Sequence, residues 1–231
     1  MPSIRRVLRA TAATTVAAAL GLAISASAAP ATAVAAHITD PEAVSWTGFS
    51  AVAPGSSYAF TSVVFGKPVR WNPCEAIHWR SNTSRGPVGG LDVVKAAVAS
   101  VAAATGTHWI YDGATTTVPR VAVLNKTTIA AQPIVIGWTD SASSDLLAGK
   151  PASTAGITRT LWFSASSDAG TIAATRGAVV ALNRNTRLPL RGGVSWQTAI
   201  THEVGHVMGL AHSRSTEQVM APTLSPGIAQ L

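Results

Sequence analysis

Hydrophobic and polar positions along this chain repeat with two different periods, which predict two kinds of element. In residues 91–105 the apolar side chains recur at helical spacing and Gly106 follows, which predicts an amphipathic helix that ends at this glycine. Short runs rich in β-branched and aromatic residues, bounded by turn residues, predict five strands. These strands are 76–80, 118–124, 133–138, 156–163 and 177–183. The order strand, helix, four strands and a final helix is typical of an α/β domain.

The final helix is predicted to follow Ser195, which has the side chain of a good N-cap. Apolar residues after it fall within an arc of about 120° when placed at 100° per residue, so this face is expected to pack in the core. They are Trp196, Ile200, Val204, Val207 and Met208. His202 and His206 lie four residues apart and are expected to project together from the opposite, exposed side.

Three of the six histidines of the chain, and one glutamate, fall within "THEVGHVMGLAH", residues 201–212. Gly209 can end the helix in a left-handed conformation, so the chain can turn back and aim His212 at the point that His202 and His206 face. Three neutral imidazoles with one open position are typical of a catalytic zinc site. Glu203 lies beside this pair, where a carboxylate can take the proton of a zinc-bound water that attacks a carbonyl.

The segment 202–212 fits the pattern H-E-x-x-H-x-x-G-x-x-H in full, and Met220 follows it in "EQVMAPT". On these residues the chain resembles the metzincin zinc metallopeptidases, and among them the secreted, bacterial-type matrixin-like group, over about residues 69–223. The resemblance implies that His202, His206 and His212 bind one catalytic Zn²⁺ and that Glu203 is the catalytic general base. It also implies that Met220 is the Met-turn residue beneath the metal.

The resemblance further implies a twisted five-stranded mixed sheet with a backing helix, an active-site helix and an antiparallel edge strand, which by order is 156–163. A peptide or protein substrate in extended form would add to that edge. Residues 222–224 would line the pocket just past the scissile bond, and the substrate-binding residues are otherwise unknown. Asp140 to Asn183 contains no histidine, so the second, structural zinc site of vertebrate matrixins is expected to be missing. Few residues follow Met220, so the closing helix of the family is expected to be short or absent.

Cys74 is the only cysteine, which excludes an intrachain disulfide. It is either a half-buried apolar thiol or a ligand that caps the metal in a latent form. Its context, "WNPCEA", differs from the proline-arginine-cysteine-glycine context of the inhibitory cysteine in matrixins. Ca²⁺ is possible but unsupported, because Asp140, Asp145 and Asp168 lie in Ser/Gly-rich loops without EF-hand spacing.

The first residues are typical of an export signal: three arginines precede an apolar run, 10–24, that is too short to span a bilayer. Two small-x-small cleavage sites, 26–28 and 31–33, remain open. We predict a signal peptide at 1–33, a short, loosely ordered leader or pro-segment at 34–66 and the catalytic domain at 67–231. The protein is then secreted and extracellular, with no stable association with a membrane once the signal is removed.

The amino-acid composition and net charge limit the kinds of molecule that the protein is expected to bind. The 231 residues are 47% hydrophobic, which suits a single domain. Loss of the signal lowers the formal net charge from +7 to about +4, and the remaining basic residues are scattered, which argues against nucleic acid. We expect a monomer that acts on peptides or proteins as a secreted zinc endopeptidase. The alternative is a zinc-stabilised, non-catalytic binding or cell-surface protein, motivated by the short C-terminus.

Overall fold

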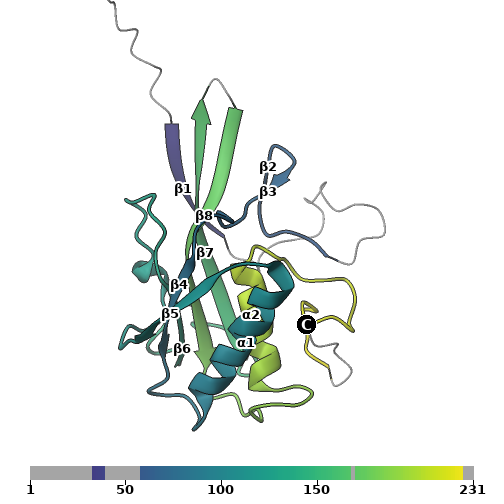
Figure 1. Ribbon diagram of the computed structural model, residues 1–231. Helices are drawn as coiled ribbons and strands as arrows, with labels where there is room; N and C mark the ends of the chain where they lie inside the picture. Colours follow the sequence, from purple (N-terminus) through teal and green to yellow (C-terminus); the bar gives the residue numbers. More distant parts are fainter. Residues whose placement is uncertain (1–32, 40–57, 168–169, 226–231) are drawn as a thin grey trace, which may run out of the picture. The chain divides into compact units, whose positions relative to one another are not determined.

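A six-stranded mixed sheet organises the residues that the computed structural model describes, which are 33–39, 58–167 and 170–225 (Figure 1). The strand order is β1-β7-β8-β6-β4-β5. The strands are β1 (Ala33–Thr39), β4 (Ile77–Asn82), β5 (Trp109–Ala114), β6 (Ile134–Thr139), β7 (Gly156–Ser167) and β8 (Gly170–Asn183). A small hairpin pairs β2 (Val63–Val64) with β3 (Lys67–Pro68). The predicted α/β class with a mixed sheet is confirmed.

The four strands β5, β4, β6 and β8 are parallel, and both faces of their centre are buried. All six residues of β6 are buried, as expected for a parallel strand covered on both sides. One core, which includes Trp79, Ile136 and Leu182, packs under the helices. A second core, which includes Leu124, Val179 and Leu161, packs under loops on the other face. The helices therefore pack on one buried face of the sheet, and loops cover the other.

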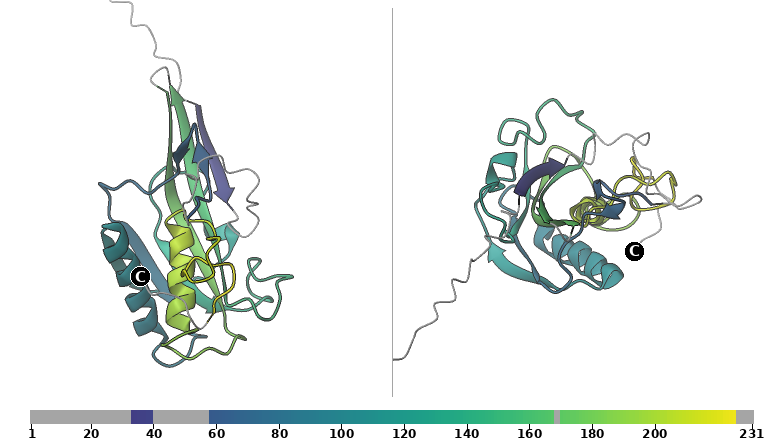
Figure 2. Two further views of the ribbon diagram at one scale, coloured as in Figure 1. Left: turned by 90° about the vertical axis from the view of Figure 1, so that its right-hand side faces the viewer. Right: turned by 90° about the horizontal axis from the view of Figure 1, so that it is seen from above.

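The helices α1 (Gly90–Thr105) and α2 (Trp196–Val207) lie side by side on one face of the sheet (Figures 1 and 2). Both were predicted close to these bounds, and Gly106 ends α1 in the left-handed conformation, at φ 66°. The indole Nε1 of the buried Trp71 donates to the Val207 carbonyl at 2.9 Å, which satisfies an orphan acceptor at the end of α2.

One predicted strand is wrong, and four strands were missed: β1, the short β2 and β3, and β5. Residues 118–124 contain only a short 3₁₀ turn, η3 (Val121–Val123), although their content of β-branched residues predicted a strand. The amide of Val121 donates to the Asp145 side chain in the loop after β6, so this backbone is satisfied by a loop rather than by a strand. The missed strand next to the parallel centre is β5, whose half-exposed sequence, with a glycine and an aspartate, has little β pattern.

The edge of the sheet also differs from expectation. Strand β7 is antiparallel to β8, as predicted, but it is an edge only over part of its length. Strand β1, from the segment expected to be loosely ordered, pairs antiparallel with β7 from Thr160 to Ser166. His37 stacks on Trp162 at a centroid distance of 3.9 Å and hydrogen-bonds Ser164 at 3.1 Å. The outer edge of β7 is therefore left uncovered by β1 only from Gly156 to Arg159.

Candidate metal centre and cleft

Helix α2 brings His202, Glu203 and His206 to one site. Its N-cap is Ser195, as predicted, and the serine hydroxyl accepts a hydrogen bond from the Thr198 amide at 3.3 Å. The expectation that both imidazoles face an exposed side is wrong, because His202 is only 7% exposed and His206 is fully buried. Helical periodicity places the two rings on one face, but it cannot show that the chain after Gly209 folds back over that face.

Gly209 makes this reversal possible. Helix α2 ends at Val207 with Met208 as its C-cap, and Gly209 takes φ +90°, in the region that favours glycine. A side chain there would also lie 2.9 Å from the Val69 carbonyl oxygen. Beyond the turn, the Ala211 amide donates to the Ala59 carbonyl at 2.8 Å, which fixes the segment that carries His212. The predicted turn at Gly209 is thus confirmed.

Two backbone carbonyls fix the imidazoles of the helix. Nδ1 of His202 lies 2.7 Å from the Val219 carbonyl oxygen, and Nδ1 of His206 lies 2.7 Å from that of Leu210. Because a carbonyl oxygen can only accept, each Nδ1 carries the hydrogen, and the lone pair of each neutral ring is on Nε2. Sequence inspection did not identify these two partners, since they contribute backbone atoms and no side-chain signal.

The three histidines form a donor set that fits zinc. One nitrogen from each of His202, His206 and His212 lies within 4.8 Å of the others. The Nε2 atoms of His202 and His206 are 3.0 Å apart. Two ligands of a tetrahedral zinc ion, with bonds of about 2.0–2.1 Å, lie about 3.3 Å apart. Two lone pairs at this separation repel each other unless a cation lies between them, so the donor chemistry favours a metal.

Strand β7 holds Glu203 in place. The Thr158 hydroxyl donates to Glu203 Oε2 at 2.7 Å and also lies 3.1 Å from the Glu203 carbonyl oxygen. Gly156 lies against the same carboxylate, because a β-carbon there would be 2.9 Å from Oε1. Glu203 is 4% exposed, so its orientation is set by these neighbours. Nothing in the sequence pattern marked Thr158 or Gly156, which lie in an ordinary strand.

Met220 packs against helix α2, and its role as the Met-turn residue stays a prediction. It is buried, and its sulfur packs directly against Gly205, where a β-carbon would overlap it. The turn is closed by hydrogen bonds from the Ser213 amide to the Met220 carbonyl and from the Ala221 amide to the Gln218 carbonyl. Gly205 therefore lets the turn lie close enough for Val219 to reach His202.

A pocket of about 310 Å³ opens beside these groups, and we call it the cleft. His202 and Glu203 line one side of it, and Gly156 lines another. Pro222, Thr223 and Leu224 also line the cleft, as expected from the sequence. The site thus joins a cation-binding donor set, a carboxylate and a cavity in one place.

Two other groups of candidate residues do not join this site. Cys74 is exposed rather than half-buried, and the metal-binding cluster found among the described residues contains the three histidines without it. The Asp140 carboxylate is paired with Arg85 and Arg184, and Asp145 accepts the Val121 amide. Asp168 lies outside the described residues.

The comparisons with known proteins agree with this geometry. A comparison with curated protein sequences found no match. The family model for matrixin matches residues 79–230, from the first parallel strand through the histidine segment and the Met220 turn. This match covers more than half of the chain and includes His202, Glu203, His206 and His212. The chain therefore belongs to the matrixin family of zinc metalloendopeptidases.

Proposed function

We propose that this matrixin is a secreted endopeptidase in which His202, His206 and His212 hold the catalytic zinc and Glu203 is the general base. The observation that carries the proposal is the convergence of three imidazole nitrogens beside a buried carboxylate that lines the same cleft. A purely structural zinc site needs no such carboxylate, and structural sites usually have four protein ligands.

Each residue has a defined task in peptide hydrolysis. Zinc, when bound, polarises the substrate carbonyl and makes the attacking water more acidic. Glu203 accepts the proton of this water as its oxygen adds to the carbonyl carbon, and returns the proton to the amine nitrogen as the C–N bond breaks. Thr158 is a positioning residue, because its hydrogen bond to Oε2 fixes the carboxylate and leaves Oε1 available for the proton. The carbonyls of Val219 and Leu210 hold the hydrogen on Nδ1 of His202 and His206, so that the Nε2 lone pair of each ring would be available to a zinc ion.

An extended peptide is the substrate that suits this cleft. The part of the outer edge of β7 that β1 does not cover, Gly156 to Arg159, lies directly before the residues that β1 pairs with. Main-chain hydrogen bonds to this edge would align a peptide across the cleft, with a side chain entering the pocket that Pro222 and Leu224 line. Because such binding requires an extended backbone, we expect unfolded or flexible protein segments to be cleaved best.

The test is casein hydrolysis by the wild-type protein and by Glu203→Gln, which keeps the size of the side chain and removes its basicity. We expect Glu203→Gln to retain one zinc per chain and to lose activity by a factor of at least about 10², the lower range for a general base. The wild-type activity should stop with a chelator and return with Zn²⁺. A protein that binds zinc but cleaves no member of a diverse peptide library would instead be a zinc-stabilised binding protein.

Secretion is part of the proposal and rests on the N-terminal sequence, which lies outside the described residues. Among the described residues, no helix combines the length and the apolar character that crossing a membrane requires. N-terminal sequencing of the protein from culture medium tests the idea directly. We expect the exported chain to begin at Ala29 or Val34, after one of the two small-x-small sites. Recovery of the uncut chain from the cells alone would contradict it.

A further inference from the structure

A second pocket, of about 510 Å³, adjoins the cleft and is lined by three arginines. We call it the arginine pocket; its cationic residues are Arg85, Arg184 and Arg187. Its apolar wall contains Trp138 and Trp196, which pack edge to face at a centroid distance of 5.5 Å. Thr186 and Leu188 line both this pocket and the cleft, so the two cavities are neighbours that share a wall.

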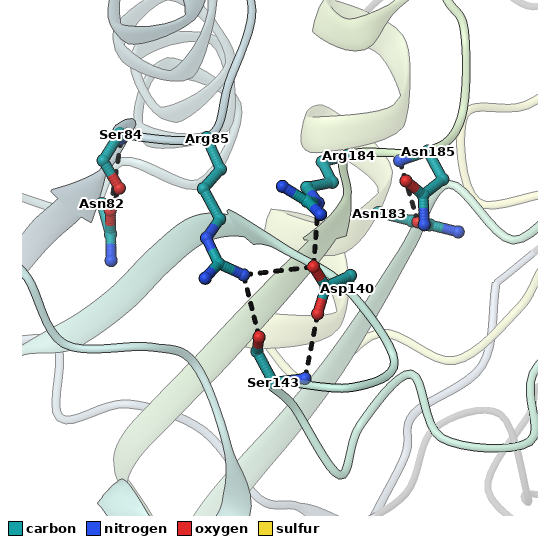
Figure 3. Close-up of polar contacts among 8 residues, drawn as sticks. All are labelled: Asn82, Ser84, Arg85, Asp140, Ser143, Asn183, Arg184 and Asn185. Carbon is teal, nitrogen blue, oxygen red and sulfur yellow. Dashed lines mark hydrogen bonds and ion pairs between the residues drawn. The ribbon is translucent and has the colours of Figure 1, made fainter.

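Asp140 anchors two of the three guanidinium groups. Arg85 Nη1 and Arg184 Nε donate to the same oxygen, Asp140 Oδ2, at 3.1 and 2.8 Å, so the arginines converge from two loops (Figure 3). Arg85 Nη1 also donates to the Ser143 hydroxyl at 2.8 Å. Gly86, next to Arg85, lets this loop lie against the Trp138 ring, since a β-carbon there would be 2.7 Å from the ring. The guanidinium groups are therefore preorganised, which lowers the entropy cost of binding a ligand.

The charges of the arginine pocket do not balance. The Asp140 side chain is 11% exposed and lies below the two arginines, which are 41% and 45% exposed. Hydrogen bonds from Ser143, together with the two guanidinium groups, lower the pKa of Asp140, so it stays ionised at neutral pH. One negative charge thus faces three positive ones, because Arg187 is exposed and has no ion pair within the described part of the chain.

The donor geometry indicates the class of ligand. The contacts above use one nitrogen of each anchored guanidinium, which leaves further N–H groups of Arg85 and Arg184 for another acceptor. The planar fork of arginine matches a carboxylate, and such pairs are stronger than neutral hydrogen bonds. In an unmodified polypeptide the anionic groups are the side chains of Asp and Glu and the terminal carboxylate.

We propose that the arginine pocket binds a carboxylate group of the polypeptide that occupies the adjoining cleft, and so selects acidic substrates. This inference rests on the proposed endopeptidase function. The bound chain passes over the shared wall at Thr186 and Leu188, and its carboxylate reaches Arg187 and the free N–H groups of the anchored arginines. Arg187 then acts as a specificity residue, because Asp140 already compensates part of the charge of the other two.

The experiment uses fluorogenic peptides that share one scissile bond. In one series Glu or Gln occupies each position in turn on both sides of that bond, and in the other the C-terminus is a free acid or an amide. The enzymes are the wild type, Arg187→Gln and the matched control Arg191→Gln, which changes an exposed arginine that does not line the pocket. The quantity compared is kcat/KM for each acid against its neutral partner.

We expect the wild type to prefer Glu over Gln by about five- to tenfold at one position, as a charge-assisted contact at a half-exposed site allows. Arg187→Gln should lower this ratio at least about threefold, and Arg191→Gln should leave it unchanged. A preference confined to the free-acid series identifies the terminal carboxylate as the ligand. Equal rates for acidic and neutral peptides throughout, or the same loss of preference in both variants, would overturn the inference.

Binding to an inactive variant separates this inference from the proposed catalytic function. Glu203→Gln should bind the preferred Glu peptide more tightly than its Gln partner, and added salt should reduce that difference. If the wild type cleaves peptides without discriminating charge, only the arginine pocket assignment fails. If Glu203→Gln cleaves like the wild type, the catalytic proposal fails, while the binding comparison still tests the pocket.

Discussion

Replacing Gly156 by alanine should displace the Glu203 carboxylate while leaving the zinc ligands in place. The new methyl group would lie 2.8 Å from Cγ, 2.9 Å from Oε1 and 3.0 Å from Cδ of Glu203, whereas ordinary contacts begin at about 3.4 Å. Gly156 does not have a positive φ, so alanine fits the backbone and the effect is steric. Glu203 must therefore retreat by at least about 0.6 Å.

The structure allows the size of the effect to be bounded. Glu203 is buried, and the Thr158 hydroxyl holds its other oxygen at 2.7 Å, so the carboxylate cannot swing freely to a new position. Because misplacement of a reacting group by 1 Å can cost about 10²-fold, we expect kcat/KM to fall by about 10- to 100-fold. Overpacking costs about 1–3 kcal/mol, and the lower entropy of the unfolded chain returns about 0.4–1 kcal/mol. The variant should thus fold with a modest loss of stability.

Three measurements on Gly156→Ala test the predicted displacement of Glu203. They are kcat/KM on a fluorogenic peptide, the number of zinc ions bound per protein, and the free energy of unfolding in urea. The matched control is Gly177→Ala, in β8, where a β-carbon would have its nearest neighbour at 3.4 Å and φ is again not positive. This control should keep wild-type kcat/KM and equal or slightly higher stability.

Three outcomes with Gly156→Ala and Gly177→Ala would contradict the proposed contact between Gly156 and Glu203. A folded Gly156→Ala protein with wild-type kcat/KM would show that the position of the carboxylate against β7 does not limit the reaction. Loss of zinc from Gly156→Ala would show that β7 positions the metal ligands instead. A similar loss of activity in Gly177→Ala would attribute the effect to the sheet as a whole rather than to contact with Glu203.

Three further predictions address the metal, the Met220 turn and acid stability. Zn²⁺ at about a thousand times its dissociation constant should add about 4 kcal/mol to the free energy of unfolding, or about 8–16 °C to the Tm measured by calorimetry. His212→Ala should lose this gain. The control His78→Ala, which changes an exposed side chain paired with Asp112, should keep it. Gly205→Ala forces the Met220 sulfur away and should cost about 1–3 kcal/mol in urea unfolding; wild-type stability would contradict the close packing. The pKa of Asp140 is lowered below 3.8, so its ionised form stabilises the fold above that pH and the benefit is lost as pH falls through the folded-state pKa. The difference in unfolding free energy between wild type and Asp140→Asn should therefore shrink as pH falls below 3.8; a constant difference would argue against this role.

Strand β1 limits the part of the β7 edge to which an extended peptide could add. Strand β1 pairs with β7 from Thr160 to Ser166 and does not extend along residues 156–159, where Gly156 and Thr158 contact Glu203. The His37 stack on Trp162 fixes this pairing at a specific place. A strand that blocks part of a sheet edge also protects it against pairing with other chains.

The sequence by itself determined which histidines come together and which helix carries two of them. The i, i+4 spacing of His202 and His206 follows from the helical period, and Gly209 signals the reversal that brings in His212, so local rules suffice for all three. The hydrophobic runs 133–138 and 177–183 likewise predicted strands, and the structure pairs these two strands parallel to each other. Such runs suit strands covered on both faces, which have few polar positions.

Only the tertiary structure decided what surrounds these groups. The carbonyls of Val219 and Leu210, the Thr158 hydroxyl and the missing β-carbon of Gly156 act through contacts between segments far apart in the chain or through backbone atoms, which leave no periodic pattern. The pairing of β1 with β7 and the loop at 118–124 depended in the same way on which partner was available for the backbone hydrogen bonds. Local spacing fixes which residues share a face, whereas packing fixes whether that face is buried and what holds it.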